Sequence, residues 1–506
     1  MAAVVVLLLA ASSGALAWFH AQGWLLYYGD AEAHLNIARR IADTRTPNYE
    51  QIGTVWLPLP HWILLPLVKH DGLWRSGLAG GLASAACFVV AGVFLFCAAR
   101  RLFGSAAAGF TAVMALALNP NAMYLQSTAM TEPVFLASLF LLLYFAVLFH
   151  QSQSVWAAVA AGVAALAATL TRYEGWFLLP FAALWIAWGA RRRWWCVALF
   201  LTIAGLGPLY WLAHNWWCYG DWLEFWRGPY SAQAIYQRSL AQGMQRYAGD
   251  GDWAKALLYF REAARLACGW PLIGAGLLGM AACLGKRVVW PVLLLLPLPV
   301  FYIASMHSGG TPIYVPHLWP NSYYNTRYGL AALPLLALGA AGLVAVAPGR
   351  WRKWMAATVL SVVAAGWLAY PRAEAWICWK ESQVNSEARR AWTREAADFL
   401  RVHYRGGGIF TSFGDLAGIY RQAGIPLREI LHEGNEPYWQ GAAARPDLLL
   451  REEWVVSMSG DKVSAAMVKT MRHGPRYLLM KQIAVKGAPV IEIYQRQGSA
   501  YVPDSR

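Results

Sequence analysis

SGLAGGLASAACFVVAGVFLFCAA, residues 76–99, carries no charged side chain and is followed directly by Arg100 and Arg101. A helix that spans a bilayer needs about 20 mostly apolar residues, so this stretch predicts a membrane span with a basic pair at its end. The whole chain has a similar character, because 58% of its 506 residues are hydrophobic, 14% are charged and the mean hydropathy is +0.37. Soluble domains carry roughly 25% charged residues. The composition therefore indicates an integral membrane protein.

Ten further apolar stretches predict that the membrane domain is all-α, with about eleven transmembrane helices. The predicted spans lie near residues 2–22, 76–99, 105–119, 131–149, 155–171, 175–189, 194–216, 266–284, 288–305, 328–347 and 353–370. The first stretch has one feature of a signal peptide, the ALA at 15–17, but no basic region precedes its apolar part. A signal peptide would have such a region, so we interpret the stretch as a retained helix.

Basic clusters at alternate span ends predict the topology. They are Arg100-Arg101, Arg191 to Arg193, Lys286-Arg287, and Arg350, Arg352 and Lys353. The positive-inside rule places this side in the cytoplasm. Residues 23–75, 217–265 and 306–327, and the chain from about residue 371 onward, are then outside. The net charge of +15 fits contact with membrane lipids. No basic stripe or nucleic-acid motif accompanies it, so no nucleic-acid partner is expected.

The C-terminal tail has the composition of a soluble domain. From residue 387 to the end it carries 17 Lys and Arg against 13 Asp and Glu. Helix-like pieces (REAADFLRVHY, LAGIYRQAG, VSAAMVKTMRHG) alternate with strand-like pieces (IFTSF, EWVVSM, YLLMKQIAV, VIEIYQR). This alternation predicts a small extracytoplasmic α/β domain at residues 371–506, after a membrane domain at residues 1–370. GGG at 406–408 precedes a predicted strand and does not open a helix, so it is not a dinucleotide-binding motif.

Ionisable side chains gather at the outer ends of the predicted spans. These are Asp30, Glu32 and His34 in YGDAEAHLNIARR, Glu132 in STAMTEPVF, Arg172 and Glu174 in LTRYEGWF, and Arg327 in NTRYGL, where Tyr328 follows it. Each has a structural explanation, since Asp30 can cap a helix at 31–42, Glu132 can open a helix before Pro133, and arginines anchor span ends. A cap needs only one carboxylate, however, and anchoring does not need two Arg-Tyr pairs. Together they indicate chemistry at the outer membrane surface.

The chain resembles the C-type (GT-C) integral-membrane glycosyltransferases at these motifs. The resemblance is to the branch that uses polyprenyl-phosphate sugars, which includes aminoarabinose transferases and protein O-mannosyltransferases. It rests on a long first outer loop that opens with YGDAEAHLNIARR, on TRYEGW and on NTRYGLAALP, within an architecture that covers residues 1–370. The resemblance implies transfer of a sugar, with inversion, from a polyprenyl-phosphate donor to a glycan, lipid or protein acceptor. The chain has no Asn-X-Ser/Thr sequon, which favours a prokaryotic cytoplasmic membrane.

The resemblance also implies roles for the outer residues. Asp30 matches the family's first-loop acid, which acts as the catalytic base or positions the acceptor. We expect Asp30 to be the base and Glu32 to be a catalytic helper that orients it or holds a metal. Arg172 and Arg327 are candidates for holding the leaving phosphate, because guanidinium groups bind phosphate through two parallel hydrogen bonds. His34, Glu132, Glu174 and Tyr328 are expected to bind substrate. Ala31 separates Asp30 from Glu32, whereas O-mannosyl relatives have adjacent acids, so a divalent metal on this pair stays open.

Short helices at 31–42 and 57–68 could frame lateral access for the prenyl chain. The second lies in GTVWLPLPHWILLPLV, which is too short and too rich in proline to span, so an interfacial or re-entrant helix is expected.

Two other functions are compatible with a protein of this kind. A lipid-linked glycan flippase or another transporter usually has ionisable residues near the midplane, often within inverted repeats. No repeat is evident in this sequence, and its acids are predicted at one face. The second alternative is a non-catalytic subunit of glycan assembly. Only the enzyme is expected to fold normally and to lose transfer when Asp30 is replaced by Asn.

Overall fold

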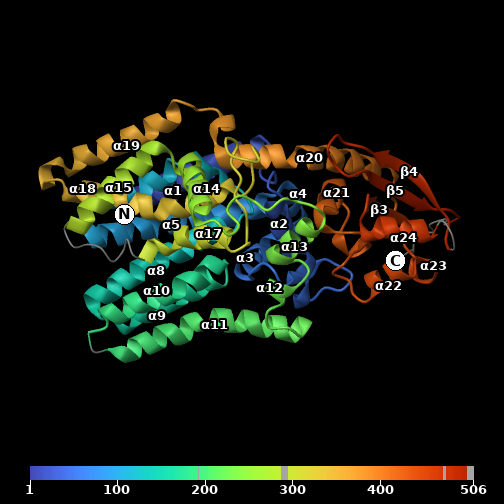
Figure 1. The fold of residues 1–506 in the computed structure, drawn as a ribbon, viewed down its shortest axis with the longest axis horizontal. Helices are drawn as coiled ribbons and strands as arrows, with labels where there is room; N and C mark the ends of the chain where they lie inside the picture. Colours follow the sequence, from blue (N-terminus) through green and yellow to red (C-terminus); the bar gives the residue numbers. More distant parts are fainter. Residues whose placement is uncertain (192, 286–293, 471–473, 499–506) are drawn as a thin grey trace. The chain divides into compact units, whose positions relative to one another are not determined.

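The computed structural model describes residues 1–191, 193–285, 294–470 and 474–498 (Figure 1). The chain divides into two compact units, which we call the helical unit and the sheet unit. The helical unit comprises Met1–Trp24, Thr54–Pro60 and Gly81–Ser382, and the sheet unit comprises Leu25–Gly53, His61–Gly80 and Gln383–Arg506. The sheet unit thus combines the C-terminal tail with two segments that follow the first predicted span.

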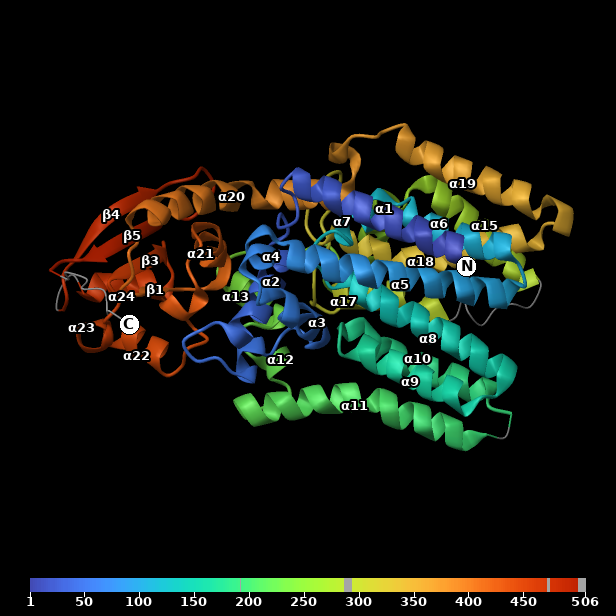
Figure 2. The same ribbon diagram turned by 180° about the vertical axis from the view of Figure 1, so that it is seen from behind.

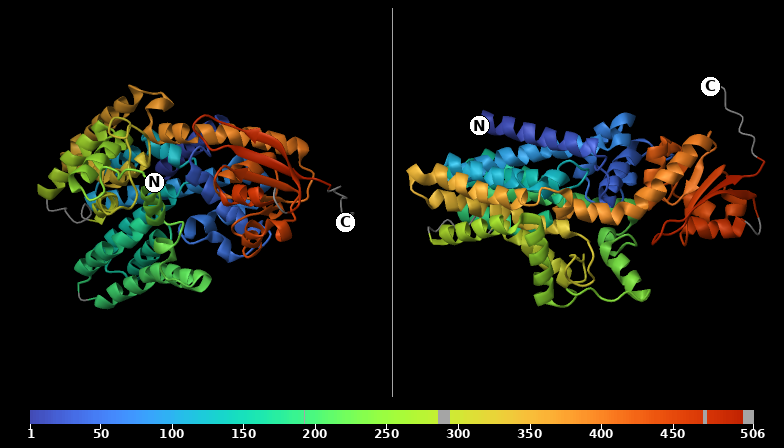
Figure 3. Two further views of the ribbon diagram at one scale, coloured as in Figure 1. Left: turned by 45° about the vertical axis from the view of Figure 1, so that its right-hand side comes forward. Right: turned by 90° about the horizontal axis from the view of Figure 1, so that it is seen from above.

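Helices make up the helical unit, and several of them are long and apolar. The helices are α1 (Ala2–Ala21), α5 (Leu78–Phe103), α6 (Ala106–Ala117), α7 (Pro120–Leu125), α8 (Glu132–Ser152), α9 (Val155–Thr169), α10 (Tyr173–Gly189), α11 (Trp194–Tyr219), α12 (Glu224–Arg227), α13 (Ala232–Ala241), α14 (Trp253–Cys268), α15 (Trp270–Gly285), α17 (Pro297–His307), α18 (Leu333–Val346) and α19 (Arg352–Leu368). Helix α1 lies along α5 (Figure 2). Helix α9 packs against α8, α10 and α11 (Figure 3).

Among the described residues, fewer helices have the length and composition of a membrane span than the eleven predicted. Within the described residues, five segments are long and apolar enough to cross a membrane, namely α1, α5, α8, α11 and Thr326–Val346. A sixth arises if α14 and α15, which are bent by 108° at their junction, form one span. The start of the predicted span 288–305 lies outside the described residues.

Proline and short helix length explain much of this difference. Helix α6 has 12 residues, and Asn119, which follows closely, precedes Pro120. A residue before proline disfavours the helical conformation. At a rise of about 1.5 Å per residue, 12 residues extend about 18 Å, well short of the roughly 30 Å hydrocarbon core. Helix α9 has 15 residues and α10 has 17, so neither reaches the length of a full span.

Small residues allow neighbouring membrane helices to approach closely. Helices α15 and α18 form the most extensive pair, and a Cβ atom on Gly279 would stand 1.8 Å from the carbonyl oxygen of Gly339. Close backbone contact through glycine is how membrane helices gain packing energy, because lipid chains are as apolar as leucine. The two ends of α11 carry exposed tryptophans, Trp194 and Trp195 at one end and Trp217 at the other, as expected at the two membrane interfaces.

The segment predicted as the first outer loop, residues 23–75, contains the two predicted short helices. Helix α3 (Leu59–Val68) has 10 residues and contains Pro66, so a short proline-containing helix is confirmed. Helix α2 (Gly29–Ala42) begins earlier than predicted, with Tyr28 at the N-cap and no side-chain cap. The interpretation of Asp30 as a cap is therefore wrong, because Asp30 lies inside the first turn together with Glu32. Helix α4 (Asp71–Ser76) follows.

The sheet unit has the α/β character predicted for the tail. Its elements are α20 (Ile377–His403, from Gln383 onward), β1 (Ile409–Thr411), α21 (Ala417–Ala423), β2 (Ile430–Leu431), α22 (Tyr438–Ala444), α23 (Pro446–Leu449), β3 (Trp454–Met458), α24 (Lys462–Thr470), β4 (Tyr477–Ile483) and β5 (Ile491–Arg496). The strand order is β2-β1-β3-β5-β4. Strands β2, β1 and β3 pair in parallel, whereas β5 pairs antiparallel with both β3 and β4. All four predicted strands and all three predicted helices are confirmed.

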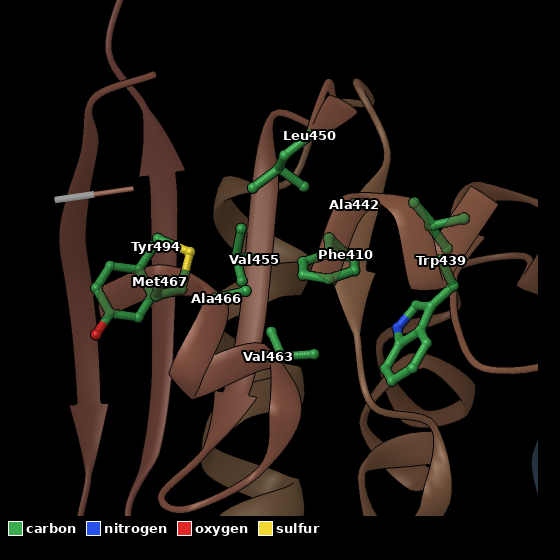
Figure 4. Close-up of a cluster of buried hydrophobic side chains, with 10 residues drawn as sticks. Phe410, Trp439, Ala442, Leu450, Val455, Val463, Ala466, Met467 and Tyr494 are labelled. Carbon is green, nitrogen blue, oxygen red and sulfur yellow. The ribbon is translucent and has the colours of Figure 1, made fainter. Parts of the chain in front are cut away.

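One buried apolar cluster holds the sheet and its helices together (Figure 4). Phe410 of β1, Val455 of β3 and Tyr494 of β5 contribute from the sheet, while Trp439 of α22 and Met467 of α24 contribute from the helices. Burying a large apolar side chain stabilises a fold by roughly 1.5–3 kcal/mol. This cluster therefore forms the core that fixes α22 and α24 on the sheet.

Candidate active site

Five of the predicted site residues meet in the helical unit, where three helices begin. Glu132 is the first residue of α8. Arg172 is the N-cap residue of α10, and Glu174 lies in its first turn. Arg327 and Tyr328 lie in the 3-10 helix Thr326–Ala332, which leads directly into α18. Three separate sequence motifs thus form one cluster.

The Arg172 guanidinium contacts four neighbours. Its Nε donates to Glu174 Oε1 at 2.6 Å, Nη1 donates to Thr131 Oγ1 at 2.6 Å, and Nη2 donates to Tyr302 Oη at 2.8 Å. Nη1 also lies 3.1 Å from Glu132 Oε1. Burial by itself would lower the pKa of Arg172, but Glu174, Tyr302 and Glu132 hold that pKa well above its usual range. Arg172 is therefore a permanently charged and tightly held cation.

Arg327 is the second cation of the cluster. Its Nη1 lies 3.1 Å from Glu381 Oε1, and its Nε lies 3.4 Å from Glu132 Oε1. The Tyr328 ring lies beneath both cations, with its centroid 5.0 Å from Cζ of Arg327 and 5.8 Å from Cζ of Arg172. Glu132 thus connects the two guanidinium groups through a single carboxylate oxygen.

Glu381 is a member of the cluster that sequence reasoning missed. Its carboxylate accepts from the backbone N–H of Asn325 at 3.1 Å and of Thr326 at 2.6 Å, and also from the Thr326 hydroxyl. The side chain is only 2% exposed. In the sequence Glu381 stands in the tail predicted to be soluble, and its one signal was that it is among the first acids after the last span. Tyr302 was hidden in a predicted apolar span, and its hydroxyl donates to Glu174.

A small cavity adjoins these residues. It has a volume of about 50 Å³ and is lined by Glu132, Arg172, Glu174, Tyr302, Arg327 and Tyr328 together with apolar side chains of α5, α7, α8 and α18. This volume holds a few water molecules. The cluster places two cations against three carboxylates, those of Glu132, Glu174 and Glu381. Buried charges persist only when they are paired in this way, and the cavity gives the cluster room for a further polar group.

The remaining predicted residues lie in the sheet unit, on α2. Glu32 Oε1 accepts from Arg421 Nε on α21 at 2.8 Å, and the two side chains are 12% and 7% exposed. Arg421 was not singled out from the sequence, where it stands in LAGIYRQAG. Asp30 is half-buried. Residues two positions apart on a helix point about 200° apart, so Asp30 and Glu32 are directed to different sides of α2.

His34 lies one turn further along α2. Its Nδ1 is 3.0 Å from Nε2 of His61, and both rings are almost completely buried. At this distance one ring nitrogen donates and the other accepts, so at least one of the two rings is neutral at that contact. His34 thus forms a hydrogen bond with His61 of α3.

No group of three or more His, Cys, Asp or Glu side chains suited to holding a metal ion occurs in the part of the chain that the structure describes. Glu32 faces a cation, Arg421. The Asp30 and Glu32 pair therefore does not fit a shared metal site.

The comparisons with known proteins confirm the resemblance predicted from the sequence, at the level of the fold and of a family match over part of the chain. Residues 59–217 match the family described as dolichyl-phosphate-mannose-protein mannosyltransferase. The chain superimposes on the crystal structure of ArnT from Cupriavidus metallidurans in the apo state with a TM-score of 0.58 and 14% identity, over 94% of this chain and 97% of that chain.

The crystal structure of ArnT from the same organism bound to undecaprenyl phosphate also gives a TM-score of 0.58 and 14% identity, over the same 94% and 97% of the two chains. At 14% identity, the similarity to these two structures shows the fold alone. Among curated proteins, none matches the chain by sequence.

Proposed function

We propose that the chain moves a sugar from a polyprenyl-phosphate donor to an acceptor hydroxyl on the outer side of a prokaryotic cytoplasmic membrane, with inversion at the anomeric carbon. The observation that carries the proposal is the ArnT-like fold together with the family match over residues 59–217, a range that contains Glu132, Arg172 and Glu174. Undecaprenyl phosphate, which the ArnT crystal structure contains, is a polyprenyl phosphate of the kind this donor would release.

Asp30 is the proposed general base. Its carboxylate takes the proton of the acceptor hydroxyl, the acceptor oxygen attacks the anomeric carbon, and the bond from that carbon to the phosphate oxygen breaks. Polyprenyl phosphate leaves with the electron pair. Asp30 is assigned this role because it matches the first-loop acid of the glycosyltransferases that the sequence resembles, and Glu32 is assigned the supporting role because it forms a largely buried ion pair with Arg421 at 2.8 Å. A base must reach its proton within hydrogen-bonding distance, and a half-buried side chain in the first turn of α2 leaves room for that.

Arg172 and Arg327 are the proposed partners of the leaving phosphate. Both are already paired with carboxylates, so a phosphate would have to compete for them. The pairs of Glu132, at 3.1 Å and 3.4 Å, are longer than the 2.6 Å bond from Arg172 to Glu174. Charge-assisted bonds between these groups are strongest near 2.7–2.9 Å. The contact of Arg327 with Glu381 is also 3.1 Å long, but Glu381 additionally accepts from the backbone N–H groups of Asn325 and Thr326. Glu132 is therefore the carboxylate that a phosphate displaces most easily.

The proposal is tested first by finding the donor. Mass analysis of prenyl-phosphate sugars and surface glycans in a strain lacking the chain should show one accumulated donor and one missing sugar. The purified chain is then given that donor, and release of polyprenyl phosphate is followed. Asp30→Asn should lower the rate by roughly a hundredfold or more, the scale of lost general-base help, while Glu50→Gln in the same loop should leave it unchanged. Normal transfer by Asp30→Asn would exclude Asp30 as the base, and no release by the parent chain would exclude the transferase function.

A further inference from the structure

A second cavity lies within the sheet unit and contains none of the residues proposed for transfer. Its volume is about 450 Å³, and it is lined by Arg45, Tyr404, Arg405, Gly406, Gly407, Gly408, Arg428 and Glu429. Its wall comes from the loop between α20 and β1, from the 3-10 helix Leu427–Glu429 before β2, and from Arg45 after α2. The lining holds three guanidinium groups and one carboxylate.

The GGG sequence at 406–408 shapes one wall of this cavity. The φ angles of its three residues are +115°, +88° and +77°, a region that other residues rarely adopt. A Cβ atom on Gly408 would lie 2.6 Å from Nη2 of Arg45, and one on Gly407 would lie 2.4 Å from a carboxylate oxygen of Glu453. The three glycines therefore let the chain turn and let the Arg45 guanidinium lie directly against the backbone.

The three arginines of the lining keep N–H donors beyond those used in the following contacts. Arg45 Nη1 lies 2.5 Å from Glu452 Oε1, and Nη2 donates to the Glu429 carbonyl at 3.2 Å. A guanidinium has five N–H donors, so these contacts fix Arg45 without using up its donors. Arg428 Nη1 lies 3.2 Å from Asp43 Oδ1, with the Arg428 side chain 65% exposed. Arg405 is exposed and donates to the Tyr404 carbonyl.

Three of the acids near the cavity have a donor partner other than its arginines. Glu429 accepts from the Tyr404 hydroxyl, Asp43 also pairs with Arg39 at 2.7 Å, and Glu453 accepts from the Gln495 amide at 3.0 Å. These contacts offset part of the negative charge around the cavity. The exposed donors of the arginines remain the groups that an incoming ligand meets first.

We propose that this cavity binds a phosphate-type oxyanion carried by the acceptor glycan or glycolipid. Guanidinium groups recognise such oxyanions through paired charge-assisted hydrogen bonds, and a cavity of about 450 Å³ has the size of an ordinary small-ligand site. The assignment to the acceptor rests on the proposed transferase function, whereas binding of the oxyanion itself does not. The ligand is a phosphorylated saccharide, and its sugar ring occupies the space beyond the arginines.

Calorimetric titration of the full chain, in a phosphate-free detergent at low salt, tests the proposal. Inorganic phosphate, glucose 1-phosphate and glucose are the three probes. Binding of glucose 1-phosphate more tightly than inorganic phosphate, with no binding of glucose, is the expected result. Equal or tighter binding of inorganic phosphate would overturn the acceptor assignment, and absence of binding by both phosphates would overturn the site.

Variants locate the binding. Arg405→Gln and Arg428→Gln should each weaken the binding of glucose 1-phosphate by about tenfold, the effect of losing about 1.4 kcal/mol from a charge-assisted hydrogen bond. Arg394→Gln removes the same charge from an exposed position on α20 and should not change the affinity. Unchanged affinity in the double variant of Arg405 and Arg428 would refute the site. Asp30→Asn should retain this binding while it loses transfer, so failure of the site and failure of the proposed function give different results.

Discussion

Glu32→Gln separates the roles of the two acids on α2. The ion pair of Glu32 with Arg421 joins α2 to α21 inside the sheet unit, at 2.8 Å and with both side chains largely buried. Replacing the carboxylate with an amide of the same shape keeps an oxygen for Arg421 Nε but leaves the guanidinium charge without its counterion. Removing one partner of a buried ion pair costs more than the pair contributes, because the remaining charge is stranded away from water.

The structure allows the size of this effect to be worked out. Breaking a buried pair costs about 3–5 kcal/mol, but Arg421 Nη1 keeps its bond to the Arg75 carbonyl, and the amide oxygen of the variant would still accept one hydrogen bond. We therefore expect a loss of about 2–3 kcal/mol in the free energy of unfolding of the sheet unit. This unit contains about 170 residues, and at that size 1 kcal/mol shifts the midpoint of thermal unfolding by about 2–4 °C. The expected decrease is about 4–12 °C.

Thermal unfolding followed by circular dichroism measures this shift, and transfer per folded molecule is measured below the transition. Glu32→Gln should lower the midpoint and keep most of the transfer activity. Asp30→Asn should do the reverse, since an acid in the first helical turn contributes only about 0.3–1 kcal/mol through the helix dipole. In the double variant of Glu32→Gln and Arg421→Gln, the decrease in the unfolding midpoint should be smaller than the sum of the decreases in the two single variants. An unchanged midpoint combined with lost transfer in Glu32→Gln would show that Glu32 is the base and that the reasoning is wrong.

Two further predictions concern the phosphate partners and the topology. Arg327→Lys keeps the charge but loses the planar guanidinium group, so the transfer rate should fall by about tenfold or more while expression stays unchanged. Arg350→Lys is the control. Full activity of Arg327→Lys would show that Arg327 has only a structural role. For topology, a cysteine at the exposed position Arg394 should react with an impermeant reagent in intact cells, and one at the exposed position Ser152 should react only after lysis. The opposite pattern would place the proposed site in the cytoplasm.

The alternation of apolar and polar residues predicted most elements of the fold. In the tail, VIEIYQR and EWVVSM read as strands because their apolar residues face a common core, and Val455 and Ile493 are indeed fully buried. The length of the apolar stretches predicted the membrane helices less accurately. A count of apolar residues does not detect an early helix end such as the one before Pro120. The ion-pair partners of the site residues were not predictable from the sequence. Glu381 and Arg421 lie far along the chain from Arg327 and Glu32, and local patterns carry no signal of such pairings.

The charge balance of the cluster in the helical unit leads to a last prediction. Arg172 and Arg327 face three carboxylates, and Glu132 is the one shared between them, at 3.1 Å and 3.4 Å. Glu174 and Glu381 hold their arginines independently, through Nε of Arg172 and Nη1 of Arg327. Removing the charge of Glu132 therefore leaves both cations in place and takes away the group that a phosphate must displace.

We expect Glu132→Gln to bind undecaprenyl phosphate about tenfold more tightly than the parent chain. The Glu132 contacts, at 3.1 Å and 3.4 Å, are longer than charge-assisted hydrogen bonds, so the competing charge is placed at the lower end of about 1.5–3 kcal/mol, and about 1.4 kcal/mol corresponds to tenfold in affinity. Tighter binding of the released lipid should also slow turnover, since that lipid is the proposed product. Native mass spectrometry of lipid binding measures the first effect, and Glu374→Gln, an exposed acid in the same unit, is the matched control. If Glu132→Gln binds the lipid more weakly, then Glu132 holds the two arginines in their binding geometry. In that case it supports the phosphate site and does not compete for it.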